Sequence, residues 1–310
     1  MTIPAHHQLQ QFVQANHLDG LTQVSLAAII HGQTGYTVQK AQNFLRFQNR
    51  INQDLLRHSI IRDNSYCKWF EKGKITPEQV QAFIVQFSVF SNLFLVAQLL
   101  KTINADTLEG MRSSKEILAN EIGVVYHSKN KKNSTGNGSA SYDPALVAIE
   151  GSIEGGQFRF QAAHFEWLLK IANKIGLEFK DVGKRHHGTA PTLHFCDELA
   201  RLYGSEDYLT SQAASYAVEN WAAAGFWSQL IHGFERYNRK TKTNLPLSFF
   251  AWHNQIEAQH ALHTQEELEE LYFCREIDED AFITTGHLML DAVAVFWNGL
   301  DEQRAQFAVE

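Results

Sequence analysis

Apolar residues recur along this chain mostly at spacings of three and four positions, and only five prolines interrupt the pattern. That spacing gathers apolar side chains on one face of an α-helix, whereas a strand would require a spacing of two. No convincing set of strands is evident. With 310 residues and 44% hydrophobic content, the chain can bury a large core as one long domain or two short ones. The sequence therefore predicts an all-α globular fold.

Charge and cysteine usage exclude several classes of protein. The formal charge is −7 and no basic stripe occurs, so nothing favours a nucleic-acid partner. The N-terminus lacks a charged start followed by an apolar run, and no stretch approaches the roughly 18 uninterrupted apolar residues of a membrane span. The three cysteines are far apart and form no CxxC, which disfavours disulfides and a thiolate zinc site. We expect a cytoplasmic protein with a small-molecule substrate and no membrane partner; a homodimer is left open.

The first sixty residues form a region of their own. Short helices are expected at about 5–16 and 37–60, with glycines as punctuation between them. We interpret residues 1–60 as an N-terminal helical extension packed on a core domain that spans residues 61–310.

A long helix of the core domain is predicted to begin at Thr76 and Pro77, because threonine is a common N-cap and proline fits the first turn. An aromatic stripe follows on one face of this helix, made of Phe83, Phe87, Phe90 and Phe94. Such a stripe is typical of core packing, and an apolar substrate channel is the alternative interpretation.

Residues 128–157 interrupt the helical pattern. Their first half is rich in Ser, Asn, Gly and Lys, a composition that buries little apolar surface. A flexible surface loop and an active-site lid are the two interpretations, of which the loop is preferred. We therefore expect an inserted loop inside the core domain.

A pattern of metal-ligand residues stands on one predicted helix at about 249–262. His253, Glu257 and His260 occupy positions i, i+4 and i+7. Since a helix turns about 100° per residue, the three fall within an arc of roughly 60° on one face. Imidazole and carboxylate suit iron, manganese or zinc, and a carboxylate can bridge two metals. Exposed polarity on a helix surface is the alternative interpretation.

Two more carboxylates and one more imidazole lie on apolar helix faces. Glu121 has apolar residues at −4, −3, +3 and +4, Glu219 lies on a face of small and apolar residues, and His164 shares its face with Leu168 and Ile171. An ionised acid is costly to bury unless it is paired or bound to a metal. A lone histidine on such a face is otherwise a hydrogen-bonded core residue.

Together these positions make a candidate set of six metal ligands: Glu121, His164, Glu219, His253, Glu257 and His260. Three carboxylates and three neutral imidazoles nearly neutralise two divalent cations and leave coordination positions open. The chain has no HExxH, which excludes a zincin. The ferritin-like di-iron bundle needs two Glu-x-x-His pairs, and only Glu257 with His260 provides one.

The order of these parts resembles the haem-oxygenase-like di-iron oxidases, also called iron-containing redox enzymes. That family has a Glu on an early core helix, a His heading a helix, a Glu within a long helix, and then His-x3-Asp/Glu-x2-His. The matching segments here are NEIG at Glu121, HFEW at His164, YAVENW at Glu219, and HNQIEAQH from His253 to His260, within about residues 75–305. The resemblance implies a seven-helix haem-oxygenase-like bundle that binds two Fe(II) ions per chain, with dioxygen as co-substrate.

One departure from the family pattern concerns the first histidine. In the family the first Glu and the first His are a few turns apart, whereas here the insertion separates Glu121 from His164. His127 is therefore a rival to His164, although position i+6 lies about 120° away from Glu121 around a continuous helix.

The resemblance implies an oxidoreductase that acts on a small organic substrate by N-oxygenation, desaturation or C–C cleavage. Tyr216, one turn before Glu219, is a candidate catalytic residue, with packing as the alternative. A metal-free member of the same fold, either thiaminase-like or a binding protein, is the alternative function, but no cysteine stands in an identifiable pocket context. Haem degradation would need an axial His opposite a glycine-rich helix, which is not evident.

Overall fold

The computed structural model describes residues 4–128, 147–153, 156–161 and 164–307, and for 4–8, 109, 124–128, 147–153, 156–161 and 257–260 it gives the backbone alone. The N-terminal region comprises α1 (Pro4–Asn16), α2 (Gln23–Ile30), α3 (Val38–Arg50), a π-helical segment (Ile51–Leu55), α4 (Ser59–Arg62) and α5 (Ser65–Glu71). The remaining helices are α6 (Pro77–Ile103), α7 (Leu108–Glu121), α8 (His164–Lys174), α9 (Ala190–Glu198) with a π-helical continuation (Leu199–Tyr203), α10 (Tyr208–Ala222), α11 (Phe226–Thr241), α12 (Ser248–Cys274) and α13 (Glu279–Gln306). The predicted helical fold class is confirmed.

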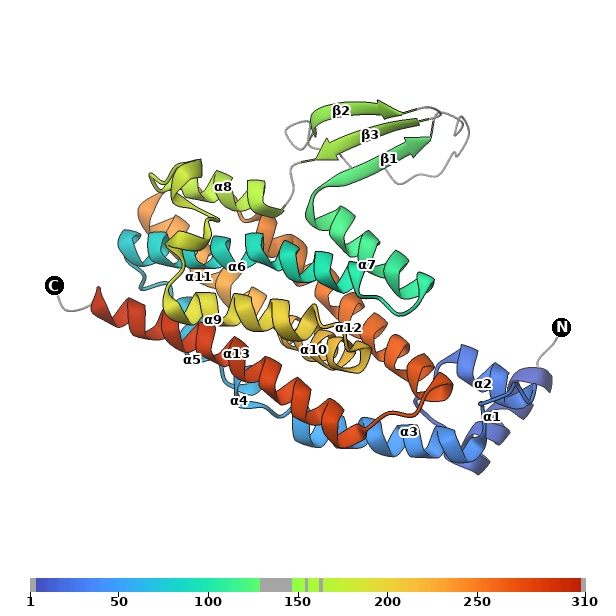
Figure 1. The fold of residues 1–310 in the computed structure, drawn as a ribbon. Coiled ribbons are helices and arrows are strands. Elements are labelled where there is room, and N and C mark those ends of the chain that lie inside the picture. Colours follow the sequence, from blue (N-terminus) through green and yellow to red (C-terminus); the bar gives the residue numbers. More distant parts are fainter. Residues whose placement is uncertain (1–3, 129–146, 154–155, 162–163, 308–310) are drawn as a thin grey trace.

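The long helices form a bundle in which α6, α9 and α13 run side by side (Figure 1). α6 begins where the sequence predicts, since Thr76 accepts a hydrogen bond from the Gln79 amide and Gln79 caps in return. By length and composition alone, α6 is the one described helix that could cross a membrane. In the described structure it packs against α7, α8 and α9.

A small antiparallel sheet stands where the sequence predicts a loop. Its strands are β1 (Val124–Ser128), β2 (Val147–Ile153) and β3 (Gly156–Gln161), in the order β1, β3, β2. The sheet projects from the end of the bundle where α7 ends and α8 begins (Figure 1). The expectation of no strands was wrong here, because Phe158 and Phe160 alternate with polar residues at the strand spacing of two inside a segment of otherwise polar composition. Residues 129–146 of the predicted loop lie outside the described residues.

Two glycines set helix boundaries that the periodicity did not predict. Gly123 has φ +73° and donates its N–H to the Asn120 carbonyl, so α7 ends at Glu121. Gly225 has φ +89° and separates α10 from α11. Glycine tolerates this left-handed backbone without a steric penalty.

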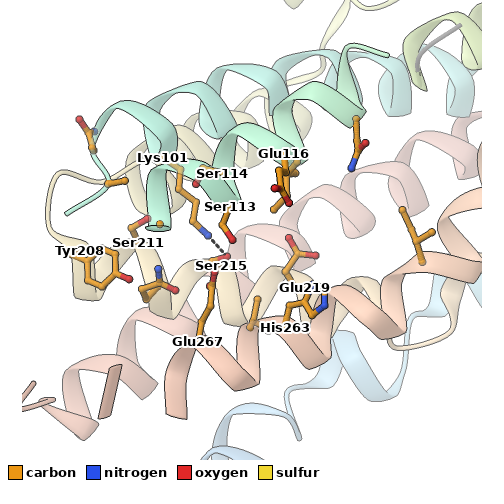
Figure 2. Close-up of a pocket in the computed structure, with 18 of the residues that line it drawn as sticks. Lys101, Ser113, Ser114, Glu116, Tyr208, Ser211, Ser215, Glu219, His263 and Glu267 are labelled. Atoms are coloured by element: carbon orange, nitrogen blue, oxygen red, sulfur yellow. Dashed lines mark hydrogen bonds between the residues drawn. The ribbon is translucent and has the colours of Figure 1, made fainter. Parts of the chain in front are cut away.

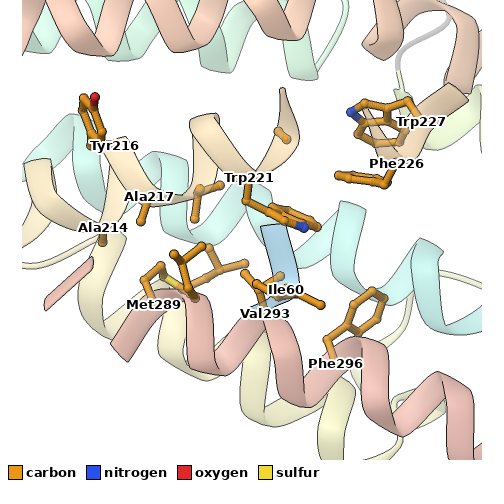
Figure 3. Packing of buried hydrophobic residues seen from close by; sticks show 14 of the residues in the cluster. Ile60, Ala214, Tyr216, Ala217, Trp221, Phe226, Trp227, Met289, Val293 and Phe296 are labelled. Atoms are coloured by element: carbon orange, nitrogen blue, oxygen red, sulfur yellow. The ribbon is translucent and has the colours of Figure 1, made fainter. Parts of the chain in front are cut away.

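The core is strongly aromatic. Phe83 and Phe87 of the predicted stripe are wholly buried, which confirms their assignment to the core. Figure 3 shows Trp221 of α10 among these buried residues, with Phe226 and Trp227 side by side at the start of α11. The rings of Trp221 and Phe226 stack with centroids 4.8 Å apart. Such offset aromatic contacts add to the free energy gained from burial alone, by about 0.5–1.5 kcal/mol per pair.

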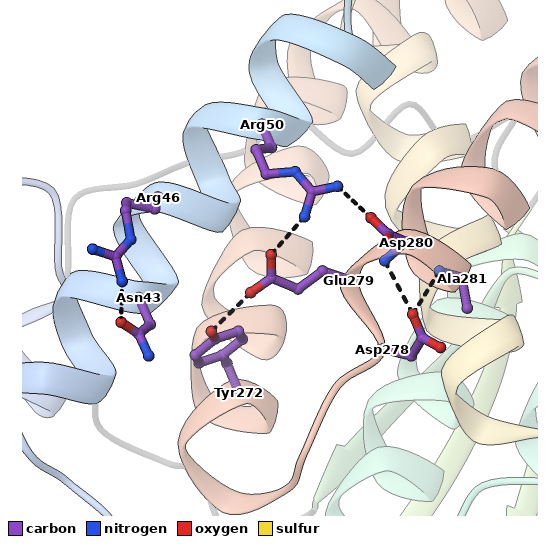
Figure 4. Close-up of polar contacts among 8 residues, drawn as sticks. All are labelled: Asn43, Arg46, Arg50, Tyr272, Asp278, Glu279, Asp280 and Ala281. Atoms are coloured by element: carbon purple, nitrogen blue, oxygen red, sulfur yellow. Dashed lines mark hydrogen bonds and ion pairs between the residues drawn. The ribbon is translucent and has the colours of Figure 1, made fainter.

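Polar contacts join α3 to the last two helices. Arg50 Nη1 donates to Glu279 Oε2 at 2.9 Å, and the Tyr272 hydroxyl donates to Glu279 Oε1 at 3.0 Å (Figure 4). Asp278 caps α13 by accepting hydrogen bonds from the Asp280 and Ala281 amides. Helix α3 therefore contacts the start of α13, close to the C-terminal end of α12, while the proposed division at residue 60 stays a prediction.

Candidate metal centre

Two of the predicted ligands meet at the base of the sheet. Glu121 is the last residue of α7 and His164 is the first residue of α8. His164 Nδ1 lies 2.7 Å from Glu121 Oε2, and the side chains are only 6% and 14% exposed, respectively. The insertion therefore leaves the bundle at one ligand and returns at the other.

His253 enters the same place from the first half of α12. Its Nδ1 lies 2.7 Å from the carbonyl oxygen of Phe249, one turn earlier. A carbonyl oxygen only accepts, so Nδ1 carries the proton and the lone pair of the neutral ring is on Nε2. Trp227 stacks on the imidazole with ring centroids 4.6 Å apart, and the Phe249 ring lies 4.3 Å from it. These contacts fix both the tautomer and the plane of the ring, as is usual for a metal-binding histidine.

Glu121, His164 and His253 form a cluster whose ligand atoms lie within 4.8 Å of one another. Metal bonds of about 2.1 Å place two ligand atoms within roughly 4 Å of each other, so small side-chain rotations suffice to accommodate an ion. One carboxylate and two imidazoles in a largely buried setting are a donor set that suits iron, manganese or zinc. The residues present therefore fit a divalent metal, and the ionic charge of Glu121 would be offset by it.

An apolar cavity of about 70 Å³ adjoins this cluster. Glu121, Glu219 and His253 supply its polar wall, and the rest is mostly aromatic, including Phe87, Phe90, Phe94, Trp221, Trp227 and Phe249. The predicted stripe on α6 thus contributes to the core at Phe83 and Phe87 and to the cavity wall from Phe87 onward. The assignment of the stripe to the core is confirmed for Phe83 and Phe87, and its use as a substrate channel stays a prediction.

A larger, more polar cavity of about 390 Å³ lies beyond Glu219 (Figure 2). Glu219 is only 7% exposed and lines both cavities, as do Ile117 and Ile256. The buried Lys101 of α6 lines the polar cavity and donates to Ser215 Oγ at 2.6 Å. Glu219 therefore stands between a hydrophilic chamber and the aromatic space beside the cluster.

No protein-family model matches this chain, and no curated protein does. Two solved structures share its architecture. A domain of unknown function with a haem-oxygenase-like fold from Shewanella denitrificans gives a TM-score of 0.56 at 15% identity, over 86% of this chain and 95% of that one. A CADD-like protein of unknown function from Nostoc punctiforme gives 0.53 at 15% identity, over 86% and 98%. The chain has a haem-oxygenase-like fold. Likeness at this identity extends to the fold alone.

Within the haem-oxygenase-like bundle, the structure brings some of the six predicted ligands together and does not describe the side chains of others. Glu121, His164 and His253 come together, and Glu219 lies across the adjoining cavity. Glu257 and His260 lie one and two turns after His253 on α12, but their side chains fall outside the described residues. Their part in the site stays a prediction.

Tyr216 and His127 lie elsewhere. The Tyr216 side chain is 3% exposed, its ring centroid is 5.9 Å from that of Phe282 on α13, and burial raises its pKa to about 12. It is not among the residues that line either cavity, and its catalytic role stays a prediction. His127 belongs to β1, where it pairs with Gln157, so the helix assumed in comparing it with His164 does not exist.

Sequence reasoning missed Lys101 and Trp227. Lys101 ends an apolar helix, where a lysine is ordinarily read as a favourable charge at the C-terminus. Trp227 is one of several aromatic residues with helical spacing, and nothing local marks it as the residue that stacks on His253. Only the fold reveals which apolar neighbours surround a polar site.

Proposed function

We propose that this protein is a non-haem di-iron oxidase or oxygenase that uses dioxygen to oxidise a small organic substrate. The observation that carries the proposal is the cluster of Glu121, His164 and His253, which three separate helices bring within 4.8 Å beside an aromatic cavity. The haem-oxygenase-like fold of two solved structures is consistent with it. We assign about two Fe(II) ions to each chain, since six carboxylate and imidazole ligands suit a dinuclear site.

The residues of the site have different roles in this proposal. His164 and His253 are the imidazole donors, and Phe249 holds the tautomer of His253 that offers Nε2. Glu121 and Glu219, with Glu257 as the proposed third carboxylate, balance the metal charge and can bridge. The aromatic wall of the small cavity limits water near the cluster, which protects a reactive centre from side reactions. Bound ferrous iron would supply the electrons that dioxygen reduction requires.

A thiaminase-like activity has less support. It requires a reactive thiol, and burial raises the pKa of the Cys67 thiol well above its ordinary value and that of Cys196 to about 12. Cys274 is exposed near the end of α12. No cysteine is among the described residues that line the two cavities at the cluster.

Oxygen consumption tests the proposed function. The protein is loaded anaerobically with about two equivalents of Fe(II) and mixed with oxygenated buffer, and dissolved oxygen is recorded with an electrode. We expect the wild type to consume oxygen faster than the same Fe(II) without protein, and Glu219→Ala to lose that excess. Glu235→Ala, on the exposed face of α11, serves as the matched control. Equal rates for the wild type and Glu219→Ala would contradict the proposal.

A further inference from the structure

A buried ammonium group faces the polar cavity. Lys101 is only 9% exposed, yet it lines this cavity, and Figure 2 shows its amine directed toward Ser215. Its Nζ donates to Ser215 Oγ and lies 4.7 Å from the centre of the Tyr203 ring. An ammonium group has three N–H donors. Among the residues whose side chains are described, Ser215 Oγ is the one acceptor that Lys101 reaches.

A buried ammonium group destabilises the fold if its N–H donors lack hydrogen-bond acceptors. Burial lowers the pKa of Lys101, while the negative charges of Glu267 and Glu219 raise it. Neither carboxylate forms an ion pair with Lys101 among the described contacts. A ligand that brings its own negative charge to Nζ would supply the missing acceptor without moving either glutamate.

The position of Lys101 relative to the cluster sets the shape of such a ligand. Ser215 precedes Glu219 by one turn of α10, a rise of about 6 Å. Ile117, Ile256 and Glu219 line both cavities, so the two spaces adjoin across a wall that is mostly apolar. A molecule whose head is held at Ser215 therefore extends along apolar surface toward His253.

We propose that the polar cavity is a carboxylate-binding subsite, in which Lys101 and Ser215 hold the carboxylate of an acid whose apolar chain reaches the aromatic cavity. The Ser215 hydroxyl accepts from Lys101 and keeps its own proton to donate to the acid. The head group lies away from the metal cluster and the carbon chain lies beside it. Oxidation of the acid's carbon chain rests on the proposed function, whereas binding of the acid does not.

Three carboxylates on the same cavity oppose this assignment and make it testable. Glu219 is buried, Glu267 is half-buried and Glu116 is exposed. If their charges dominated the cavity, it would prefer a cation over an anion. Because Glu116 faces solvent, its field is screened more strongly than that of the buried Lys101.

Isothermal titration of the metal-free wild type with hexanoate, 1-hexanol and hexylammonium tests whether the positive charge of Lys101 or the negative charge of the glutamates dominates the cavity. These probes share a chain and differ in the head group. We expect hexanoate to bind about tenfold or more tightly than 1-hexanol, and hexylammonium no more tightly than the alcohol. Tighter binding of hexylammonium than of hexanoate would overturn the proposal, as would equal binding of all three.

Two variants test whether Lys101 is responsible for the preference for hexanoate. Lys101→Met should reduce hexanoate affinity to that of 1-hexanol while leaving the alcohol's affinity unchanged, which also reports that the cavity is folded. Lys115→Met, on the exposed face of α7, is the control and should bind as the wild type does. Hexanoate affinity unchanged in Lys101→Met would overturn the assignment, and if that variant does not fold, the probe series on the wild type decides alone. Hexanoate binding without iron uptake would contradict only the di-iron proposal. Iron uptake without hexanoate binding would contradict only the proposed carboxylate subsite.

Discussion

His164 Nδ1 and Glu121 Oε2 lie 2.7 Å apart although 43 positions separate the two residues. Each stands at the end of a helix that packs on α6, and the three-stranded sheet occupies the sequence between them. An insertion at this point lengthens the chain without moving either side chain. The contact therefore explains how two candidate ligands can lie together although a long segment separates them in the sequence.

The contact predicts the roles of two histidines. His164→Ala should lower iron occupancy by about half or more, because removing a ligand or its hydrogen-bonded partner costs roughly 10–100-fold in affinity. His127→Ala should leave occupancy unchanged, since His127 belongs to β1. Metal analysis of both variants after Fe(II) loading checks this, and the reverse pattern would place the site at the start of the sheet.

The segment between β1 and β3, which includes β2, is predicted to be dispensable for the bundle. Replacement of residues 130–155 by a short Gly-Ser linker should keep helical content and shift the melting temperature by no more than about 2–4 °C. The reason is that α7 and α8 are held by packing on α6. Circular dichroism during heating measures both quantities, and loss of cooperative unfolding would show that this segment is structural.

Metal binding should order α12. Without a metal, the largely buried Glu121 keeps only its contact with His164, and the helix that bears His253 can open locally once the ion no longer holds it in the cluster. An ion that binds only the ordered state stabilises it by mass action. Hydrogen exchange with and without Fe(II) should show increased protection at 249–262. Equal protection in both samples, at confirmed iron occupancy, would mean that packing alone holds this segment.

Lys101 should reduce stability at neutral pH. Burial is the main cause that lowers its pKa in the folded protein, so the folded state binds its proton less well than the unfolded state does. The penalty is complete below the folded pKa and disappears as pH rises through it toward the unfolded value. Lys101→Met should therefore be more stable than the wild type at pH 7, by about 1 kcal/mol.

The difference in the free energy of unfolding between Lys101→Met and the wild type should become smaller at alkaline pH. Urea denaturation of the wild type and Lys101→Met at pH 7 and near pH 10 measures it, with Lys115→Met as the exposed control. A wild type that is more stable than Lys101→Met at pH 7 would show that Ser215 and the Tyr203 ring compensate fully for the buried charge.

Local signals in the sequence were enough to place helix starts and inward-facing acids. Thr76 and Pro77 act through the backbone beside them, so their effect on α6 does not depend on the rest of the fold. Glu121 was recognisable because a carboxylate among apolar neighbours needs a partner. Its partner, His164, was predicted to share the site, and the structure brings the two into contact.

Features that depend on tertiary contact were not predictable. The strands of the insertion gain their stability from one another, and the pairing of Tyr126 with Phe158 joins segments that are distant in sequence. The break at Gly225 depends on a positive φ that a helical pattern alone does not reveal. Lys101 became visible as a cavity residue only once α6, α7, α10 and α12 enclosed a common space.

The central claim is that the cluster binds iron, and the most direct test is metal analysis of purified protein after anaerobic Fe(II) loading and removal of free metal. We expect about two irons per chain in the wild type and loss of most of them in His253→Ala. His232→Ala, an exposed histidine on α11, should retain the wild-type content. Full iron content in His253→Ala, or a single zinc in place of iron, would contradict the account.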